Sequence, residues 1–375
     1  MQSEKQSNSL TKQLLQSATE ASLVPFLAIL TAVVVGGLII KFVGGDPFLA
    51  YKGLIQGSLG SKKALSETAV WATPYIFAGL AVAIGFKGGL FNIGAEGQLA
   101  VGAVFSALIG YALPEWLGTD LPTIIHLPLA ILCGVLMGGL WAGIVGALKA
   151  YTGGHEVINT IMMNYIALNT TSFLLNGVMK DKSPTNVIAR TPLIEDSARI
   201  SPIFEGLRVH WGFVLALLVA FLIWWLLNKT TLGFEIRTVG LNPDAAQYAG
   251  VNVKRTIILT MALSGMLAGM AGAIEVTGLN YRHELGFSIG YGYDAIAIAL
   301  LGKSHPLGIV LSAFLFAAMR NGASRMQFLT QLPVDLISMI QALILLFVAA
   351  DAIIRLIYRI KSKGERVVLT RGWGG

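Results

Sequence analysis

The sequence predicts an all-α membrane protein, a polytopic bundle of about ten transmembrane helices. Hydrophobic residues make up 55% of the 375 positions, charged residues make up 13%, and the mean hydropathy is +0.70. Soluble domains carry about 25% charged residues, so this composition indicates an integral membrane protein. Several apolar runs also reach the roughly 20 residues that a helix needs to cross a ~30 Å hydrocarbon core.

The chain is expected to consist of a cytoplasmic amino-terminal segment at 1–22, a transmembrane domain at 23–357 and a basic cytoplasmic tail at 358–375. The first apolar run, 23–43, is too long for a signal-peptide core and has no small-residue cleavage site after it, so it is expected to remain as a span. A polar stretch with a short amphipathic piece follows at 44–63. Nine further spans are expected at 66–86, 90–112, 126–148, 157–178, 211–228, 256–277, 290–302, 306–320 and 333–356.

The distribution of charge favours an orientation with both termini in the cytoplasm. The long polar loop at 180–210 is expected outside and is left out of the comparison, because long loops cross regardless of their charge. Among the short loops, Lys and Arg are enriched on the cytoplasmic side, and the basic tail is typical of a cytoplasmic juxtamembrane segment. Lys52, Lys62 and Lys63 fall on the external side and argue against this orientation.

Small residues recur four positions apart in several spans, which places them on one face of each helix. In a membrane, such residues let neighbouring helices approach closely. The pattern predicts tight packing between spans but indicates nothing about the solute. The residues concerned are Gly102, Ser106 and Gly110; Gly134 and Gly138; Gly139 and Gly143; and Gly265 and Gly269.

The segment 230–255 is a polar, basic stretch between two apolar spans. Within it Asn242 can cap a helix, Pro243 suits the first helical position, and Asp244 favours the positive end of the helix dipole. A helix of about ten residues is expected to follow, with its natural stop near Gly250. Two interpretations stay open, an element that a cytoplasmic partner moves or an ordinary amphipathic interfacial helix.

Two acidic residues lie at membrane depth, where ionisable groups are costly and usually face a cavity or a partner. Glu96 lies in the glycine-rich stretch NIGAEGQ, and Asp294 lies in GYGYD. Their shared Gly-x-acid pattern suggests an inverted repeat whose halves bracket a central pathway. Glu96 can instead cap a neighbouring chain at a helix end, and asparagines on the fifth span are often interhelical hydrogen-bond formers. The residues predicted to line a substrate pathway are Asn92, Glu96, Gln98, Asn164 and Asp294.

Two other motifs are set aside, and neither a metal site nor a catalytic residue is predicted. Gly302-Lys303-Ser304 imitates the end of a phosphate-binding loop, but Ala297 occupies the earlier glycine position. His155-Glu156 lacks a second histidine four residues on, so it is not a zinc-protease helix. Because the loops supply no catalytic grouping, an enzyme is disfavoured.

Three stretches resemble a known transporter family. Residues 88–103 read GGLFNIGAEGQLAVGA, residues 231–255 read TLGFEIRTVGLNPDAAQYAGVNVKR, and residues 294–302 read DAIAIALLG. The first is similar to the signature of permease subunits of bacterial ABC importers in the branched-chain amino acid, simple-sugar and nucleoside group, in the form most like the nucleoside branch. The third resembles the family's D-x-I-A-x-x-x-L-G run, although Lys303 stands where many members have another glycine.

The second stretch resembles the family's cytoplasmic coupling segment, with a G-x-N-x-x-A-A-x-x-x-G-I core. Gly240, Asn242, Ala245, Ala246 and Gly250 fit that core, and Val251 takes the isoleucine position. The resemblance implies that this segment contacts an ATP-binding subunit. The residues expected to couple to the ATPase are Gly240, Asn242, Pro243, Asp244, Ala245, Ala246, Gly250 and Val251.

The resemblance implies an importer in the bacterial cytoplasmic membrane with several other chains. These are a second permease subunit, usually a different and smaller one, ATP-binding subunits, and an extracytoplasmic substrate-binding lipoprotein that delivers a small polar solute. ATP and Mg²⁺ would bind the partner ATPase, so no cofactor is expected on this chain, and its scattered net charge of +7 does not suggest nucleic acid. The alternative is an ion-coupled secondary transporter that uses Glu96 and Asp294 as coupling carboxylates. Such a transporter has no need for the capped helix at 242–252.

Overall fold

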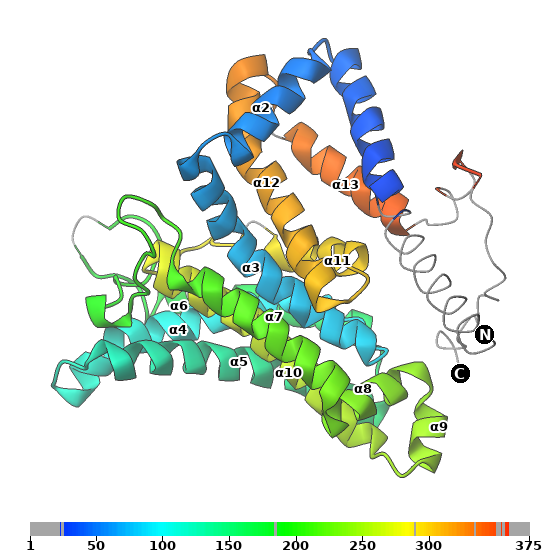
Figure 1. Cartoon of the computed structure of the whole chain (residues 1–375). Helices are drawn as coiled ribbons and strands as arrows, with labels where there is room; N and C mark the ends of the chain where they lie inside the picture. Colours follow the sequence, from blue (N-terminus) through cyan, green and yellow to red (C-terminus); the bar gives the residue numbers. More distant parts are fainter. Residues whose placement is uncertain are drawn as a thin grey trace, which may run out of the picture. The chain divides into compact units, whose positions relative to one another are not determined.

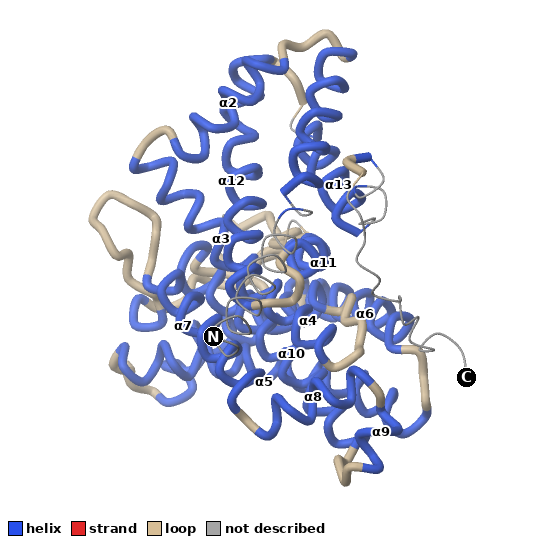
Figure 2. The backbone as a smooth tube through the Cα atoms, turned by 45° about the vertical axis from the view of Figure 1, so that its right-hand side comes forward, coloured by secondary structure: helices blue, strands red, loops and turns tan. Residues whose placement is uncertain are grey.

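The computed structural model describes residues 23, 26–183, 186–288, 290–333, 335–349, 354 and 357–359, and within them the regular structure is helical (Figures 1 and 2). The chain forms two compact units, one of Met1–Leu49 with Leu332–Gly375 and one of Ala50–Gln331. The predicted amino-terminal segment and most of the predicted tail lie outside the described residues. All residues predicted for the pathway and for coupling belong to the unit Ala50–Gln331.

The helices follow the expected order, with some altered bounds. The first is Phe26–Phe42. The others are α2 (Pro47–Leu59), α3 (Lys62–Lys87), α4 (Ala95–Leu117), α5 (Thr123–Thr152), α6 (Glu156–Asn176), α7 (Trp211–Lys229), α8 (Thr231–Leu241), α9 (Pro243–Tyr248), α10 (Val253–Glu275), α11 (Tyr291–Leu301), α12 (Pro306–Thr330) and α13 (Asp335–Ala349). A 3₁₀ turn lies at Asp196–Ala198, and a π turn at Val276–Asn280 continues α10.

Six of the described helices are long and apolar enough to cross a membrane, namely α3, α4, α5, α7, α10 with its π turn, and α12. The helix Phe26–Phe42, α11 and α13 are shorter apolar helices. With 11 residues, α11 is about 16 Å long, which is roughly half of a ~30 Å hydrocarbon core. The run expected to cross at 290–302 is therefore a half-length helix.

In the unit Met1–Leu49 with Leu332–Gly375, the helix Phe26–Phe42 packs on the carboxyl-terminal part of the chain. Ala28 and Ile354 form a buried apolar pair, which Phe347 covers. The Thr31 hydroxyl lies 3.0 Å from the hydroxyl of Tyr358. These contacts join segments more than 300 residues apart in the sequence.

In the unit Ala50–Gln331, α4, α5 and α10 pack through glycines, as the small-residue spacing predicts. A Cβ atom on Gly134 would lie 2.6 Å from the carbonyl oxygen of Gly102, and one on Gly138 would lie 2.5 Å from that of Gly265. A Cβ atom at either position would clash, so these helix backbones touch directly, with no side chain between them. Gly143 differs, because its nearest neighbour would be Ala262 Cβ at 3.9 Å.

The same unit has two ends that α3 connects. Near the start of α3, Glu67 forms an ion pair with Arg208 of the loop 180–210 at 3.1 Å. After the end of α3, a Cβ atom on Gly89 would lie 3.0 Å from the Cα atom of Gly240 in α8. The long polar loop and the predicted coupling segment therefore lie at opposite ends of α3, as their predicted locations on opposite sides of a membrane require.

Candidate functional site

The segment 88–94 joins α3 to α4 without helical structure, and a pair of buried amides fixes its shape. Asn92 Nδ2 donates to Gln98 Oε1 at 2.9 Å, and Gln98 Nε2 donates back to Asn92 Oδ1 at 3.0 Å. Asn92 Nδ2 also donates to Ser264 Oγ on α10, and its Oδ1 accepts from the Gly94 N–H. The predicted pathway residues Asn92 and Gln98 are thus engaged inside the chain, where they position the start of α4.

Asn164 joins α6 to the same segment. Its Oδ1 accepts the Gly97 N–H at 2.8 Å, and its Nδ2 donates to the carbonyl oxygen of Ile93 at 2.9 Å. The Gly97 N–H lies in the first turn of α4, where backbone N–H groups have no partner within the helix. Asn164 therefore has the interhelical hydrogen-bonding role that was one interpretation of the fifth-span asparagines.

Glu96 places a carboxylate at the start of α11. Its Oε2 accepts the Gly292 N–H at 2.7 Å, and the residue is 4% exposed. A Cβ atom on Gly292 would overlap the backbone of Glu96 and would lie 2.8 Å from the carbonyl carbon of Ala95, so the starts of α4 and α11 are in direct contact. A carboxylate is favoured at the positive end of a helix dipole. The arrangement matches the capping interpretation of Glu96 and leaves a pathway role as a prediction.

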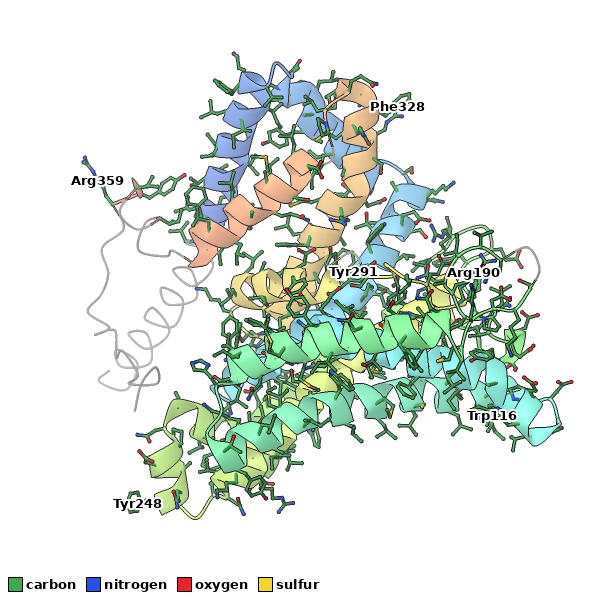
Figure 3. All side chains as sticks on the ribbon, turned by 180° about the vertical axis from the view of Figure 1, so that it is seen from behind. Trp116, Arg190, Tyr248, Tyr291, Phe328 and Arg359 are labelled. Carbon is green, nitrogen blue, oxygen red and sulfur yellow. The ribbon has the colours of Figure 1, made fainter. Side chains whose placement is uncertain are left out.

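Asp294 and a carboxylate that sequence reasoning missed complete the surroundings of the first turn of α11. Asp294 Oδ2 accepts a hydrogen bond from the Tyr75 hydroxyl at 2.7 Å. The ring of Tyr75 packs edge-on against Tyr291, with 5.1 Å between centroids. Buried Glu275, the last residue of α10, lies beside the side chain of Tyr291, which Figure 3 labels. Because Glu275 closes an apolar span, only its neighbours identify it as part of this site.

Polar residues on α6 are exposed among apolar ones such as Met162 and Phe173. Tyr165 is 61% exposed, and Asn169 and Asn176 are exposed as well. On α11, Tyr293 is 50% exposed, and its hydroxyl lies 3.5 Å from Asn164 Nδ2. Sequence reasoning missed both tyrosines, although the four-residue step from Tyr165 to Asn169 is a signal that places two polar residues on one helix face.

A capped helix, α9, lies where the coupling helix was predicted, with the expected ends but a shorter length. The Asn242 side-chain oxygen accepts the N–H groups of Asp244 and Ala245, and Pro243 is the first residue. At the other end Gly250 has a φ of +84°, and the Val251 N–H donates to the Ala246 carbonyl at 3.0 Å. This is the hydrogen bond that a glycine stop makes.

The expectation of about ten residues for this helix was wrong, because α9 has six. The left-handed conformation of Gly250 ends it, and Asn252 already caps α10 by accepting the Arg255 N–H at 3.1 Å. The residues before Asn242 were described from the sequence only as part of a polar, basic stretch, with no helix predicted. They form α8, whose first turn Thr230 caps by accepting the Gly233 N–H.

The residues predicted to couple to an ATPase differ in what they contact. Ala246 is fully buried against its own chain, whereas the other residues of α9 are exposed. Tyr248 is 94% exposed at the end of α9, and Leu241 is 78% exposed just before it (Figure 3). Large exposed apolar side chains on a compact capped helix are typical anchors of a protein interface. Tyr248 and Leu241 are thus candidate docking residues that sequence reasoning missed.

Gly240 connects the coupling segment to the segment 88–94. A Cβ atom on Gly240 would overlap the carbonyl oxygen of Lys87 and lie 2.8 Å from both Gly88 C and Gly89 N. All three atoms belong to the backbone, so α8 and the end of α3 touch directly. Movement of α8 would therefore act on the chain that leads to Glu96.

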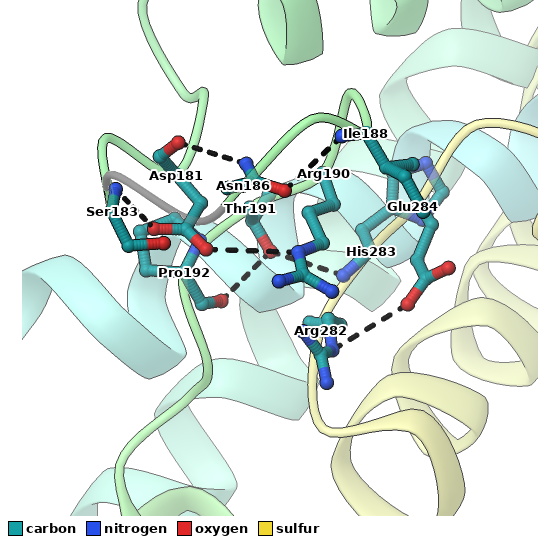
Figure 4. Close-up of polar contacts among 10 residues, drawn as sticks. All are labelled: Asp181, Ser183, Asn186, Ile188, Arg190, Thr191, Pro192, Arg282, His283 and Glu284. Atoms are coloured by element: carbon teal, nitrogen blue, oxygen red, sulfur yellow. Dashed lines mark hydrogen bonds and ion pairs between the residues drawn. The ribbon is translucent and has the colours of Figure 1, made fainter.

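At the other end of this unit, the loop 180–210 pairs with the residues that follow α10 (Figure 4). The Thr191 N–H donates to the His283 carbonyl at 2.9 Å, and the His283 N–H donates to Thr191 Oγ1 at 3.0 Å. Burial lowers the pKa of the His283 imidazole to about 3. The loop therefore packs against the residues between α10 and α11.

A polar pocket of about 570 Å³ also opens at this end, between α2, α3 and α12. Its lining includes exposed Lys63 and Arg325, together with Glu67, which pairs with Arg208. Asn321 fixes the floor by donating to the Gly57 and Ala64 carbonyls. The pocket is thus preformed, and its unpaired lining charges are positive.

Comparison with known proteins places these features in a family context. Over residues 64–349 the chain matches the protein family described as the permease component of branched-chain amino acid transport systems. It is 42% identical to the guanosine ABC transporter permease protein NupP of Bacillus subtilis, over 91% of this chain and 97% of NupP. It is 34% identical to the nucleoside ABC transporter permease protein NupB of Lactococcus lactis, over 91% and 94% of the two chains. It is also 34% identical to the glucose ABC transporter permease protein TsgB13 of Haloferax volcanii, over 86% of each. No solved structure matches the chain.

Proposed function

The chain belongs to the family of permease components of branched-chain amino acid transport systems, and we propose that it is the membrane subunit of an ABC importer for nucleosides. The observation that carries this proposal is the continuous backbone contact from the capped helix α9, through Gly240 of α8, to residues 87–89. A secondary transporter has no use for an exposed helix joined rigidly to its pathway. An importer driven by separate ATP-binding subunits needs one.

Transport follows from alternating access of the unit Ala50–Gln331. ATP-driven closure of the partner subunits moves α9 and α8 as a rigid body, and Gly240 passes this motion to residues 87–89. The next fixed point is the start of α4, where Glu96 holds the Gly292 N–H of α11. In this scheme Asn92, Gln98 and Asn164 hold the non-helical segment 88–94 in one conformation. Asp294 lies beside the pathway.

Non-helical backbone at membrane depth supports a central pathway at this place. Lipid-exposed irregular backbone is not tolerated there, because its polar groups would lack hydrogen-bond partners, whereas backbone that lines a cavity is. Two such segments, 88–94 and 285–288, lead to the touching starts of α4 and α11. This pairing of glycine-broken segments also supports the inverted repeat suggested by the sequence.

The topology we propose has about ten spans, with both termini cytoplasmic. In it the segment 230–255 faces the cytoplasm, and the loop 180–210 faces outside, since the two lie at opposite ends of α3. The external end then carries the pocket with Lys63 and Arg325, which fits acidic side chains of a substrate-binding lipoprotein. Such charge complementarity steers the encounter of two proteins.

The complete importer contains further chains in this proposal. A second, different permease pairs with this one, and ATP and Mg²⁺ bind separate ATPase subunits that dock on α9. The chain itself carries out transport and no hydrolysis. Guanosine and other nucleosides are the proposed solutes because the relatives NupP and NupB carry those names.

The test is uptake of radiolabelled guanosine into proteoliposomes that hold the purified importer, with the binding protein outside and ATP inside. The proposal expects uptake that requires ATP and persists when an ionophore collapses ion gradients. Competition with uridine and with glucose identifies the solute class. Uptake that needs an ion gradient and no ATPase would instead establish the ion-coupled secondary transporter.

A further inference from the structure

The short helix α11 packs along α3 through two contacts that lie one helical turn apart. The Tyr75 hydroxyl donates to Asp294 Oδ2 at 2.7 Å. One turn further along both helices, a Cβ atom on Gly79 would lie 2.9 Å from Cγ2 of Ile298, so the isoleucine fills the place that a larger residue in α3 would occupy. Two contacts in the same register prevent α11 from sliding or turning against α3.

The side chain of Tyr75 is held by its neighbours as well as by its hydroxyl. Tyr75 is fully buried, and its ring packs edge-on against Tyr291 of α11 and Phe316 of α12, with 5.1 and 6.4 Å between ring centroids. A buried hydroxyl needs a hydrogen-bond partner, and Asp294 supplies it. A hydrogen bond to a carboxylate is roughly twice as strong as one between neutral groups. Among the described residues, no other side-chain hydrogen bond joins α3 to α11.

The same helix, α3, reaches the predicted coupling segment. Lys87 ends α3 about 18 Å beyond Tyr75, at ~1.5 Å per residue, and its carbonyl oxygen lies against Gly240 of α8. The first turn of α11 in turn presents the Gly292 N–H to Glu96 Oε2 at the start of α4. A movement of α8 can thus reach the contact between α4 and α11 through α3, as well as through the non-helical chain between α3 and α4.

We propose that Tyr75 is a positioning residue for transport, because its hydrogen bond to Asp294 makes α3 and α11 one moving body that carries the motion of α8 to the start of α11. The proposal rests on the proposed function and adds the residue that links the two helices. It also makes Asp294 an acceptor for Tyr75, in place of the coupling carboxylate that a secondary transporter would need. Loss of the hydrogen bond therefore lowers the number of solute molecules carried per ATP hydrolysed.

The test measures guanosine uptake and ATP hydrolysis together, in proteoliposomes that hold the whole importer with the binding protein outside and ATP inside. Tyr75→Phe keeps the ring and removes the hydroxyl. It is expected to lower the number of guanosine molecules carried per ATP about tenfold, since a hydrogen bond to a charged group biases an equilibrium by at least this factor. Asp294→Leu should have the same effect, whereas Asp294→Asn should lose less, because its amide oxygen still accepts the Tyr75 O–H.

A double variant, Tyr75→Phe with Asp294→Leu, separates coupling from stability. Each single variant leaves a polar group without its partner, which lowers thermal stability, whereas replacing both partners by apolar groups can be nearly neutral. The double variant should therefore melt near the wild-type temperature, yet carry as few guanosine molecules per ATP as either single variant. It also carries the test if a single variant fails to assemble, since neither partner is left unpaired.

The matched control is Tyr111→Phe on α4. Tyr111 is half-buried, packs against the buried cluster of Val104, Leu175 and Met179, and forms no side-chain hydrogen bond with any residue that the structure describes. This variant should match the wild type in uptake, in ATP hydrolysis and in melting temperature. Such a result shows that removal of a tyrosine hydroxyl from a membrane helix does not by itself impair the importer.

Three results would overturn this role of Tyr75. The first is a wild-type ratio of guanosine to ATP in Tyr75→Phe, and the second is full recovery of that ratio in the double variant, which would leave only a packing contact. The third is an equal loss in Asp294→Asn and Asp294→Leu, which would show that transport needs the charge and not the hydrogen bond. A wild-type importer that carries no nucleoside would overturn the proposed function itself, whereas these three results leave it intact.

Discussion

Replacing Gly240 by alanine tests the proposed route from the coupling segment to the pathway. The new methyl group would overlap the Lys87 carbonyl oxygen and lie 2.8 Å from both Gly88 C and Gly89 N, whereas ordinary contacts of a Cβ atom begin at 3.4 Å. The backbones must therefore separate by at least about 0.6 Å. Since no flexible side chain is available to move aside, α8 or the segment 88–94 has to shift.

Overpacking of this kind costs typically about 1–3 kcal/mol. If that energy falls on one of the two transport conformations, it changes their equilibrium by roughly 5- to 150-fold. We expect Gly240→Ala to remain in the membrane and to bind the ATPase, because α9 keeps its cap and its exposed side chains. Guanosine uptake should fall about tenfold or more, while ATP hydrolysis becomes less dependent on the binding protein.

The matched control is Gly143→Ala in α5, where the new methyl group meets only Ala262 Cβ at 3.9 Å. A glycine-to-alanine change inside a helix with free space stabilises it by about 0.5–1 kcal/mol, so this variant should transport normally. ATP-driven uptake into proteoliposomes and thermal melting of the purified complex measure both variants. Wild-type uptake in Gly240→Ala would refute the route through residues 87–89.

Two further predictions concern the two ends of the unit Ala50–Gln331. Tyr248→Ala should weaken binding of the co-purifying ATPase by about 2 kcal/mol or more, as expected for an exposed aromatic anchor. Tyr248→Phe should still co-purify with the ATPase. Full ATPase recovery with Tyr248→Ala would rule out Tyr248 as an anchor. The pKa of buried His283 is about 3, below the usual 6.5, so the unfolded chain binds the extra proton first as pH falls. Stability is therefore unaffected by this group above pH 6.5 and falls from about pH 6.5 down to about pH 3. Melting of the purified protein across that range should show a weaker pH dependence in His283→Asn, and an unchanged dependence would show that another group is responsible.

Local sequence rules predicted the ends of α9 better than its length. Asn242 and Gly250 act through bonds to residues within five positions, so their roles can be inferred without a fold. The helix α8 escaped prediction because it is a short segment that contains the charged residues Glu235 and Arg237. It is stabilised by burying Ile236 and Val239 against the bundle, which is a tertiary contact.

Only part of the candidate site could be predicted, because the rest of it also depends on tertiary contacts. The cost of an ionisable group at membrane depth singled out Glu96 and Asp294. The later start of α4, at Ala95, depends on the amide pair of Asn92 and Gln98 and its contact with α10, which no local rule contains. The exposure of Tyr165, like that of Tyr293 and Tyr248, likewise depends on which helices pack nearby.

Glu96 holds the two halves of the proposed pathway together, and its charge and its hydrogen bond can be separated. Glu96→Gln keeps an acceptor for the Gly292 N–H but removes the charge, whereas Glu96→Leu removes both. A carboxylate at a helix start contributes about 0.3–2 kcal/mol, so a pure capping role predicts a small loss of thermal stability in Glu96→Gln and normal uptake. A pathway role predicts strongly reduced guanosine uptake in Glu96→Gln at nearly wild-type stability. Glu96→Leu should be less stable under either role, since it leaves a buried N–H without a partner. We expect reduced uptake at nearly wild-type stability in Glu96→Gln, because a capping role alone does not explain why two non-helical segments meet at this carboxylate. Normal uptake in Glu96→Gln would leave Glu96 with the capping role alone.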